Sequence, residues 1–171
     1  MRDEQIQDAQ IQNAPVKVLL VGVDIGEDAD FAHSMEELAS LAEAADKEVT
    51  GQIIQKLDHI NKALYIGTGK VTEVRRMATE CGAQEIVFDN SLTPSQVRNL
   101  GDELGLPILD RTNLILDIFA IRAQTREAKL QVETARLQYM LPRLVGMNDA
   151  LSRQGGASGS MSNKGTGEKK L

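Results

Sequence analysis

The sequence has little of several residue types, and each shortage excludes a class of protein. It has one cysteine, Cys81, so an internal disulfide is excluded and a reducing cytoplasm is the natural setting. Its two histidines, His33 and His59, stand apart from any Cys or His cluster, which argues against structural zinc. No apolar run approaches the roughly 18 residues of a membrane span, and the polar start of the chain does not resemble a signal peptide. Aromatic residues make up only 3%, so aliphatic side chains must build the core.

Segments typical of strands alternate with segments typical of helices along the first two thirds of the chain. Residues 16–23 form a nearly continuous β-branched run, which predicts a strand buried on both faces. Thr93, Pro94 and Gln96 have the spacing of a capped helix start, and Gly105 ends that helix. The alternation predicts an α/β fold with a parallel sheet flanked by helices. The other expected strands are 49–57, 63–66, 85–89 and 107–109, and the other expected helices are 30–46 and 71–81.

A long helix with a polar and an apolar side is expected after the last strand. Leu130, Leu137 and Leu144 recur every seven residues, and Leu141 lies on the same side of such a helix. This spacing predicts an apolar seam of coiled-coil type. Pro142 has no backbone N–H to donate, so the helix is expected to kink or end nearby.

The sequence divides into parts of different charge. Its net charge of −6 conceals an asymmetry. Residues 1–121 hold 10 Lys and Arg against 21 Asp and Glu, whereas residues 122–171 hold 9 against 4, a net of +5. Only this basic part is expected to touch phosphate, although Arg126, Lys129 and Arg136 are interpreted as solvating charges of a helix. The expected parts are a disordered leader (1–15), an α/β sheet domain (16–111), a helical arm (112–151) and a glycine-rich loop, disordered in isolation (152–171).

The glycine-rich end of the chain has the composition of a slim loop that enters folded RNA. Five of the 14 glycines lie between residues 155 and 167. Arg153 and Lys164 are candidates for phosphate contacts, and Gln154 and Asn163 for hydrogen bonds to base edges or 2′-hydroxyls. A flexible linker has similar Gly and Ser content and remains the alternative. The candidate RNA-binding residues are Arg153, Gln154, Gly155, Gly156, Asn163, Lys164, Gly165 and Gly167.

A second glycine-rich turn contains Gly67, Gly69 and Lys70, between an expected strand and an expected helix. Amides at a helix start favour an anion, so this layout is a candidate nucleotide site. The full phosphate-loop pattern, however, has four residues between its glycines and a Ser or Thr after the Lys, and Val71 follows Lys70 here. A tight turn at the end of a strand is the structural interpretation. No nucleophile–base pair stands out, so no catalytic residue and no metal ligand is predicted.

Five stretches carry long, ordered motifs: Tyr65–Glu73, Phe88–Leu100, Asp110–Glu133, Ser152–Gly156 and Gly165–Glu168. Together they resemble the N-terminal region of HflX-family GTPases. The resemblance covers nearly everything from about Val16 onward. It implies a cytoplasmic protein that binds the large ribosomal subunit, is linked to splitting or rescuing ribosomes, and hydrolyses GTP in a separate G domain.

In that family the tail motif lies between two antiparallel helices, and its loop approaches the peptidyl-transferase centre. The second helix, the phosphate-loop motif and the rest of the G domain are absent from this sequence. The chain is therefore expected to be a domain of a longer protein, without cofactor of its own, while GTP and Mg²⁺ belong to the missing domain. The resemblance also implies that the second helix packs on the leucine seam, so a homodimer through the uncovered helix is expected.

Two functions from different classes follow. The first is a large-subunit rRNA-binding domain of an HflX-type GTP-binding protein, which acts through the tail. The second is an α/β domain with its own ATP or GTP site at residues 67–70. They differ in which glycine-rich segment binds the ligand: the tail binds RNA in the first, and residues 67–70 bind a nucleotide in the second.

Overall fold

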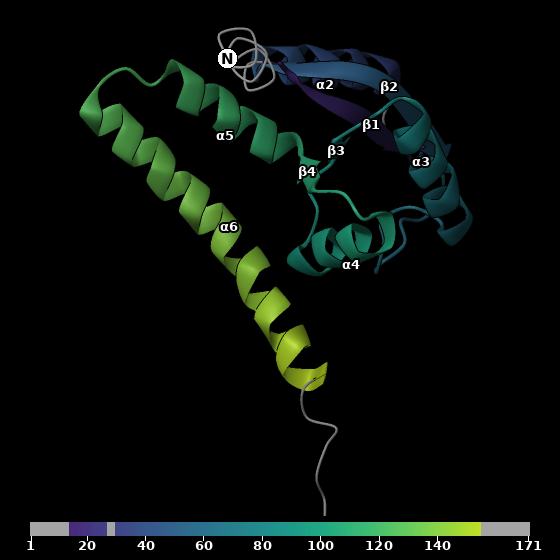
Figure 1. The fold of residues 1–171 in the computed structure, drawn as a ribbon. Coiled ribbons are helices and arrows are strands. Elements are labelled where there is room, and N and C mark those ends of the chain that lie inside the picture. Colours follow the sequence, from purple (N-terminus) through teal and green to yellow (C-terminus); the bar gives the residue numbers. More distant parts are fainter. Residues whose placement is uncertain (1–13, 27–29, 155–171) are drawn as a thin grey trace, which may run out of the picture.

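The computed structural model describes residues 14–26 and 30–154, with the backbone alone for residues 145–154. Four parallel strands form one sheet in the order β2-β1-β3-β4, with helices on both faces (Figure 1). The predicted α/β fold with a long C-terminal helix is thereby confirmed. The elements are β1 (Val16–Asp24), α2 (Phe31–Ala44), β2 (Lys47–Lys56), α3 (Thr68–Glu80), β3 (Glu85–Phe88), α4 (Pro94–Leu104), β4 (Ile108–Asp110), α5 (Arg111–Arg122) and α6 (Arg126–Gln154).

β1 lies in the middle of the sheet and supplies both halves of the core. Leu19 and Val21 pack with residues of α3 and α4 on one face. Val18 and Leu20 pack with residues of α2 and α5 on the other. All four side chains are fully buried. Because successive side chains of a strand point to opposite faces, a central strand covered on both sides must be apolar at nearly every position.

The ends of α4 follow the local sequence signals. The side chain of Thr93 accepts a hydrogen bond from the Gln96 amide, and the Gln96 side chain accepts one from the Thr93 amide. This is the predicted capping box. Gly105 ends the helix in the left-handed conformation with a φ of 69°, which glycine adopts without a steric cost.

The predicted strand at residues 63–66 is wrong. Asn61 forms a compact turn instead, because its side-chain oxygen accepts the amides of Ala63 and Leu64 at 2.8 and 2.9 Å. Asn61 and Tyr65 also exchange two backbone hydrogen bonds, and Tyr65 has a left-handed φ of 64°. The apolar residues at this point are buried because the turn folds onto the core, not because the chain is extended.

The helical arm consists of two antiparallel helices, α5 and α6, which residues 123–125 join (Figure 1). Asn113 Nδ2 lies 4.0 Å from Met140 Sδ, and Asp117 pairs with Arg136 at 3.4 Å. The residue number falls on α6 as it rises on α5, which defines the antiparallel direction. α6 also packs against α4. α6 therefore has upstream partners, which leave the leucines of its seam about half exposed.

The sequence predicts a kink or an end near Pro142; α6 continues past Pro142 to Gln154, so the helix does not end there. Residues on either side of the proline, Tyr139 and Arg143, are both held against the α/β domain, and these contacts keep the helix on course. The seam itself is exposed: Leu130, Leu137, Leu141 and Leu144 are 50–59% accessible. Within the described ranges no helix is long and apolar enough to cross a membrane.

Candidate functional site

The predicted RNA-contacting tail follows directly from α6. Arg153 and Gln154 are the last two residues of that helix, and only their backbone is described. The anchoring of α6 is therefore the part of this site whose geometry is visible. The remaining predicted contact residues, Gly155, Gly156, Asn163, Lys164, Gly165 and Gly167, lie outside the described residues.

Asp110, the last residue of β4, is the centre of the anchor. Its side chain is completely buried. One carboxylate oxygen accepts the amide of Asn113 at 3.2 Å, and the other accepts the amide of Leu92 at 3.0 Å. From α6, the hydroxyl of Tyr139 donates to this second oxygen, and Arg143 Nη2 lies 3.6 Å from it. One carboxylate thus caps α5, fixes the loop after β3 and binds α6.

Arg143 completes the anchor from one turn further along α6. Its guanidinium donates to the carbonyl oxygens of Leu92 and Tyr139, both at 2.8 Å, and its central carbon lies 3.6 Å from the Tyr139 ring centroid. The side chain is only 12% exposed, so its ion pair with Asp110 is screened little by water. Tyr139 and Arg143 were not among the functional residues predicted from the sequence. Their only signal is a Tyr and an Arg four positions apart on the helix side away from the seam.

Burial raises the pKa of the Tyr139 hydroxyl above its ordinary value of 10.0, and the hydrogen bond and negative charge of Asp110 raise it further. The phenol is therefore held in its neutral, donating form. Because the folded pKa is raised above the unfolded one, this contribution to stability is complete below about pH 10. It is lost as the pH rises above that value, where the unfolded state releases its proton first.

A Tyr139→Phe variant keeps the ring beneath Arg143 and loses only the donor to Asp110. We expect its free energy of unfolding to fall by about 1.5–3 kcal/mol, the usual worth of a hydrogen bond to a charged group. Urea denaturation at pH 8 and near pH 10.5 measures both effects. The native chain should lose more stability between these pH values than the variant, and equal losses would contradict the role of the phenol.

The carboxyl ends of β1 and β3 are where an α/β sheet of this strand order usually binds a ligand. Here Arg111 joins the elements that meet there. Its Nη2 donates to Asp89 at 2.5 Å and to the Ser34 hydroxyl at 3.0 Å, and its Nη1 pairs with Glu37 at 3.1 Å. The Ser34 hydroxyl donates to Asp89 at 2.8 Å. These charges satisfy one another and hold α2 and α5 together at this edge.

The turn with Gly67, Gly69 and Lys70 does lie at the start of a helix, α3. The amide of Gly67, however, donates to the side-chain oxygen of Gln55 at 2.9 Å. Lys70 Nζ pairs with Glu73 at 2.6 Å. Two of the groups that a phosphate would contact, the Gly67 amide and the Lys70 ammonium, therefore already have partners in the chain.

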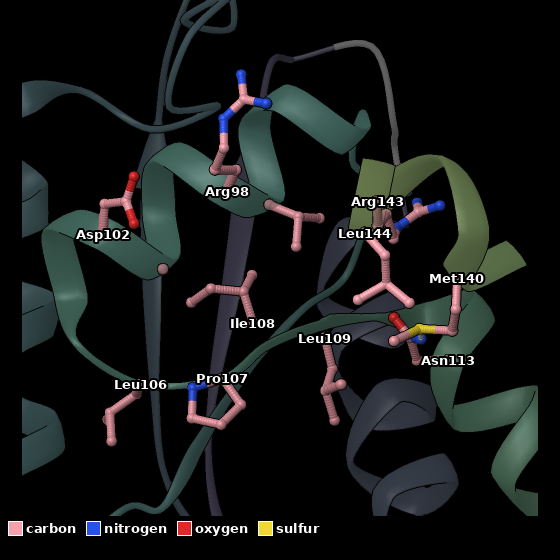
Figure 2. Close-up of a pocket in the computed structure, with 12 residues that line it drawn as sticks. Arg98, Asp102, Leu106, Pro107, Ile108, Leu109, Asn113, Met140, Arg143 and Leu144 are labelled. Carbon is pink, nitrogen blue, oxygen red and sulfur yellow. Dashed lines mark hydrogen bonds between the residues drawn. The ribbon is translucent and has the colours of Figure 1, made fainter. Parts of the chain in front are cut away.

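An apolar cavity of about 340 Å³ lies beside the anchor, between α4, β4 and α6. Figure 2 shows Leu144 and Met140 of α6 pointing toward Leu109 of β4, with Asn113 next to Met140 and Ile108 of β4 to the left. Leu144 belongs both to this cavity and to the exposed seam, so the apolar surface is continuous from one to the other. α6 is thus held by a compact polar anchor and leaves apolar space next to it.

The fold and the anchored arm define a class of protein: an α/β domain whose sheet serves to support a helical arm. Residues 32–120 match the family described as GTP-binding GTPase N-terminal, and residues 122–171 match the family described as GTP-binding GTPase Middle Region. The boundary between the two matches falls at the end of α5. The chain belongs to this family, as the N-terminal region of an HflX-type GTPase.

Individual relatives agree with that membership. The GTPase HflX of Alkalihalophilus pseudofirmus is 48% identical over 90% of this chain and 36% of its own length. The GTPase HflX of Escherichia coli is 36% identical over 93% of this chain and 36% of its own length. A solved GTP-binding protein from Sulfolobus solfataricus, in complex with GDP, matches 81% of this chain with a TM-score of 0.58 and 28% identity, over 41% of its length. The chain thus spans about a third of the length of these HflX relatives.

Proposed function

We propose that this chain is the ribosome-binding part of an HflX-type GTPase, acting in the cytoplasm on the large ribosomal subunit. The α/β domain supports α6, and the glycine-rich tail that follows α6 contacts ribosomal RNA. Splitting or rescue of ribosomes is then the process that the whole protein serves.

The observation that carries the proposal is that the arm is fixed to the α/β domain and that the net charge of the chain changes from negative to positive along it. Asp110, Tyr139 and Arg143 fix α6 through a buried network, so the arm leaves the acidic α/β domain in one direction. From residue 122 onward the chain holds 9 Lys and Arg against 4 Asp and Glu. A fixed arm with a basic, slender end suits contact with phosphates inside a folded RNA.

GTP and Mg²⁺ are assigned to a domain outside this sequence. The 171 residues contain no phosphate loop with four residues between its glycines and a Ser or Thr after the Lys. At the 67–70 turn, the Gly67 amide is bonded to Gln55 and Lys70 is paired with Glu73. The GDP-bound relative from Sulfolobus solfataricus is more than twice as long as the part that this chain matches, which leaves room for a separate nucleotide domain.

Arg153→Ala combined with Lys164→Ala is expected to weaken binding to purified large ribosomal subunits. Each lost phosphate contact should lower the slope of log affinity against log salt by about 0.7–0.9, so the pair should lower it by about 1.5. Co-sedimentation with subunits over a series of salt concentrations measures this slope. The matched control is Lys17→Ala with Lys56→Ala, which removes the same charge from β1 and β2. Equal losses from the two pairs would refute a contact by the tail.

The alternative, a nucleotide site at residues 67–70, predicts a different result. Because Gln55 holds the Gly67 amide and Glu73 holds Lys70, we expect no measurable GTP or ATP hydrolysis by this chain alone. Phosphate release under single-turnover conditions is the measurement. Reproducible hydrolysis that disappears in Lys70→Ala would overturn this expectation and favour the alternative.

A further inference from the structure

The corner where α5 ends and α6 begins carries an exposed aromatic ring among exposed cations. Phe119 is 56% accessible. Arg122, Arg126 and Lys129 follow it, and all three are exposed. None of the three forms an ion pair with another described residue, whereas Arg136 further along α6 pairs with an aspartate of α5. The corner therefore presents charge that the rest of the described fold does not neutralise.

The helix dipoles account for Arg122, which lies in the last turn of α5 where a positive charge is favoured, but not for Arg126 and Lys129. A helix favours negative side chains in its first turn, because its dipole is positive there. α6 nevertheless begins with Arg126 and has Lys129 one turn later, with Glu127 as the acidic residue between them. Thr125 already caps the helix by accepting the Ala128 amide at 3.1 Å. The fold itself does not explain why Arg126 and Lys129 are positively charged, whereas binding of a negatively charged partner would.

The arrangement of the apolar side chains selects the kind of partner. Phe119 and Ile121 are both more than half exposed, but two positions on a helix are about 200° apart. They point in nearly opposite directions. Ile115, which is 37% exposed, lies one turn from Phe119 on the same side of α5. These two side chains form a small apolar patch, not the long apolar face of a helix that inserts into a lipid surface. Phe119 and Arg122 are three positions apart and are therefore neighbours on α5. One exposed ring next to cations is the arrangement that stacks an unpaired base and holds its phosphates.

We propose that this corner, residues 119–129, is a second RNA-binding site. Phe119 stacks on an unpaired base, and Arg122, Arg126 and Lys129 bind the neighbouring phosphates. The proposal rests on the proposed function for the class of partner but uses a different surface. In Figure 1 the corner lies at the N-terminal end of α6, whereas the tail follows the other end of this helix in the sequence, and a helix of 29 residues is roughly 43 Å long. The arm then contacts RNA at two well-separated points.

Phe119→Leu removes the ring and keeps an apolar side chain of similar size. Fluorescence anisotropy with a labelled RNA hairpin that has an unpaired loop should show affinity about tenfold weaker for this variant. A fully paired duplex of equal length should bind both proteins equally. The matched control, Ile121→Leu, alters an exposed residue on the other side of α5 and should bind the hairpin like the native chain.

The cations are tested separately, so the result does not depend on Phe119 alone. Arg122→Gln, Arg126→Gln and Lys129→Gln together should reduce the salt slope for the hairpin by about 2. Lys17→Gln with Lys62→Gln, on β1 and the loop after β2, should leave it unchanged. Unaltered affinity in Phe119→Leu and an unaltered slope in the triple variant would overturn the proposal.

Two further outcomes separate this site from the tail and from membranes. Loss of hairpin binding in Arg153→Ala, Lys164→Ala but not in the corner variants would overturn the corner site and leave the tail as the RNA contact. Loss of hairpin binding in the corner variants but not in the tail variant supports the corner as an RNA-binding site and argues against an RNA contact by the tail. Binding to phosphatidylserine vesicles that Phe119→Leu abolishes, with RNA binding unchanged, would overturn the proposal in favour of a lipid surface.

Discussion

Replacement of Asp110 by alanine is expected to lower the free energy of unfolding by about 3–5 kcal/mol. The change removes one partner of a buried ion pair and leaves the guanidinium of Arg143, which is 12% exposed, without its counter-charge. It also removes the cap of α5 and the acceptor of the Leu92 amide. A whole domain is stable by only about 5–15 kcal/mol, so this loss is a large fraction of the total. Urea denaturation followed by circular dichroism gives the value.

Asp110→Asn is the matched control for this prediction. Asparagine caps helices about as well as aspartate and keeps an oxygen acceptor, but it carries no charge. It should therefore lose less stability than the alanine variant, and the difference between them isolates the contributions of the cap and the acceptor. A change below about 1 kcal/mol in Asp110→Ala would show that the buried network does not hold α6 to the domain.

The native 171-residue chain is expected to form a weak dimer through α6 as its concentration rises. Leu130, Leu137, Leu141 and Leu144 are each about half exposed, so further burial of each offers about 1 kcal/mol, and two copies together roughly 6–12 kcal/mol. Association costs about 4–15 kcal/mol, which is comparable to this gain, so the expected dimer is weak. A self-complementary stripe usually pairs with its own copy about a two-fold axis. Analytical ultracentrifugation over a wide concentration range should show the transition.

Leu137→Glu with Leu144→Glu should abolish the dimer, because each charge would have to be buried in the seam. Gln131→Glu with Gln138→Glu adds the same charge to the same helix, roughly 90–100° around its axis from the seam. That control should dimerise like the native chain. A native chain that stays monomeric at every concentration would refute pairing through the seam.

Several features of this protein follow from the sequence alone because their causes are local. The run from Val16 to Val23 must be a covered central strand, since β-branched side chains point to both faces. Thr93 and Gln96 cap α4 through atoms three residues apart, and Gly105 ends that helix with a φ that few other residues adopt. The recurrence of leucine every seven residues likewise fixes which side of α6 is apolar, whatever covers it.

Only the tertiary structure decided the features whose causes are distant in sequence. Tyr65 looks like a strand residue, but hydrogen bonds to Asn61 turn the chain there and place its ring against the core. α6 passes Pro142 because Tyr139 and Arg143 contact Asp110 and Leu92, partners 29 and 51 residues away along the chain. No local pattern reports a contact across such a separation. The anchor that directs the arm exists only because the parallel sheet brings the end of β4 next to the returning helix.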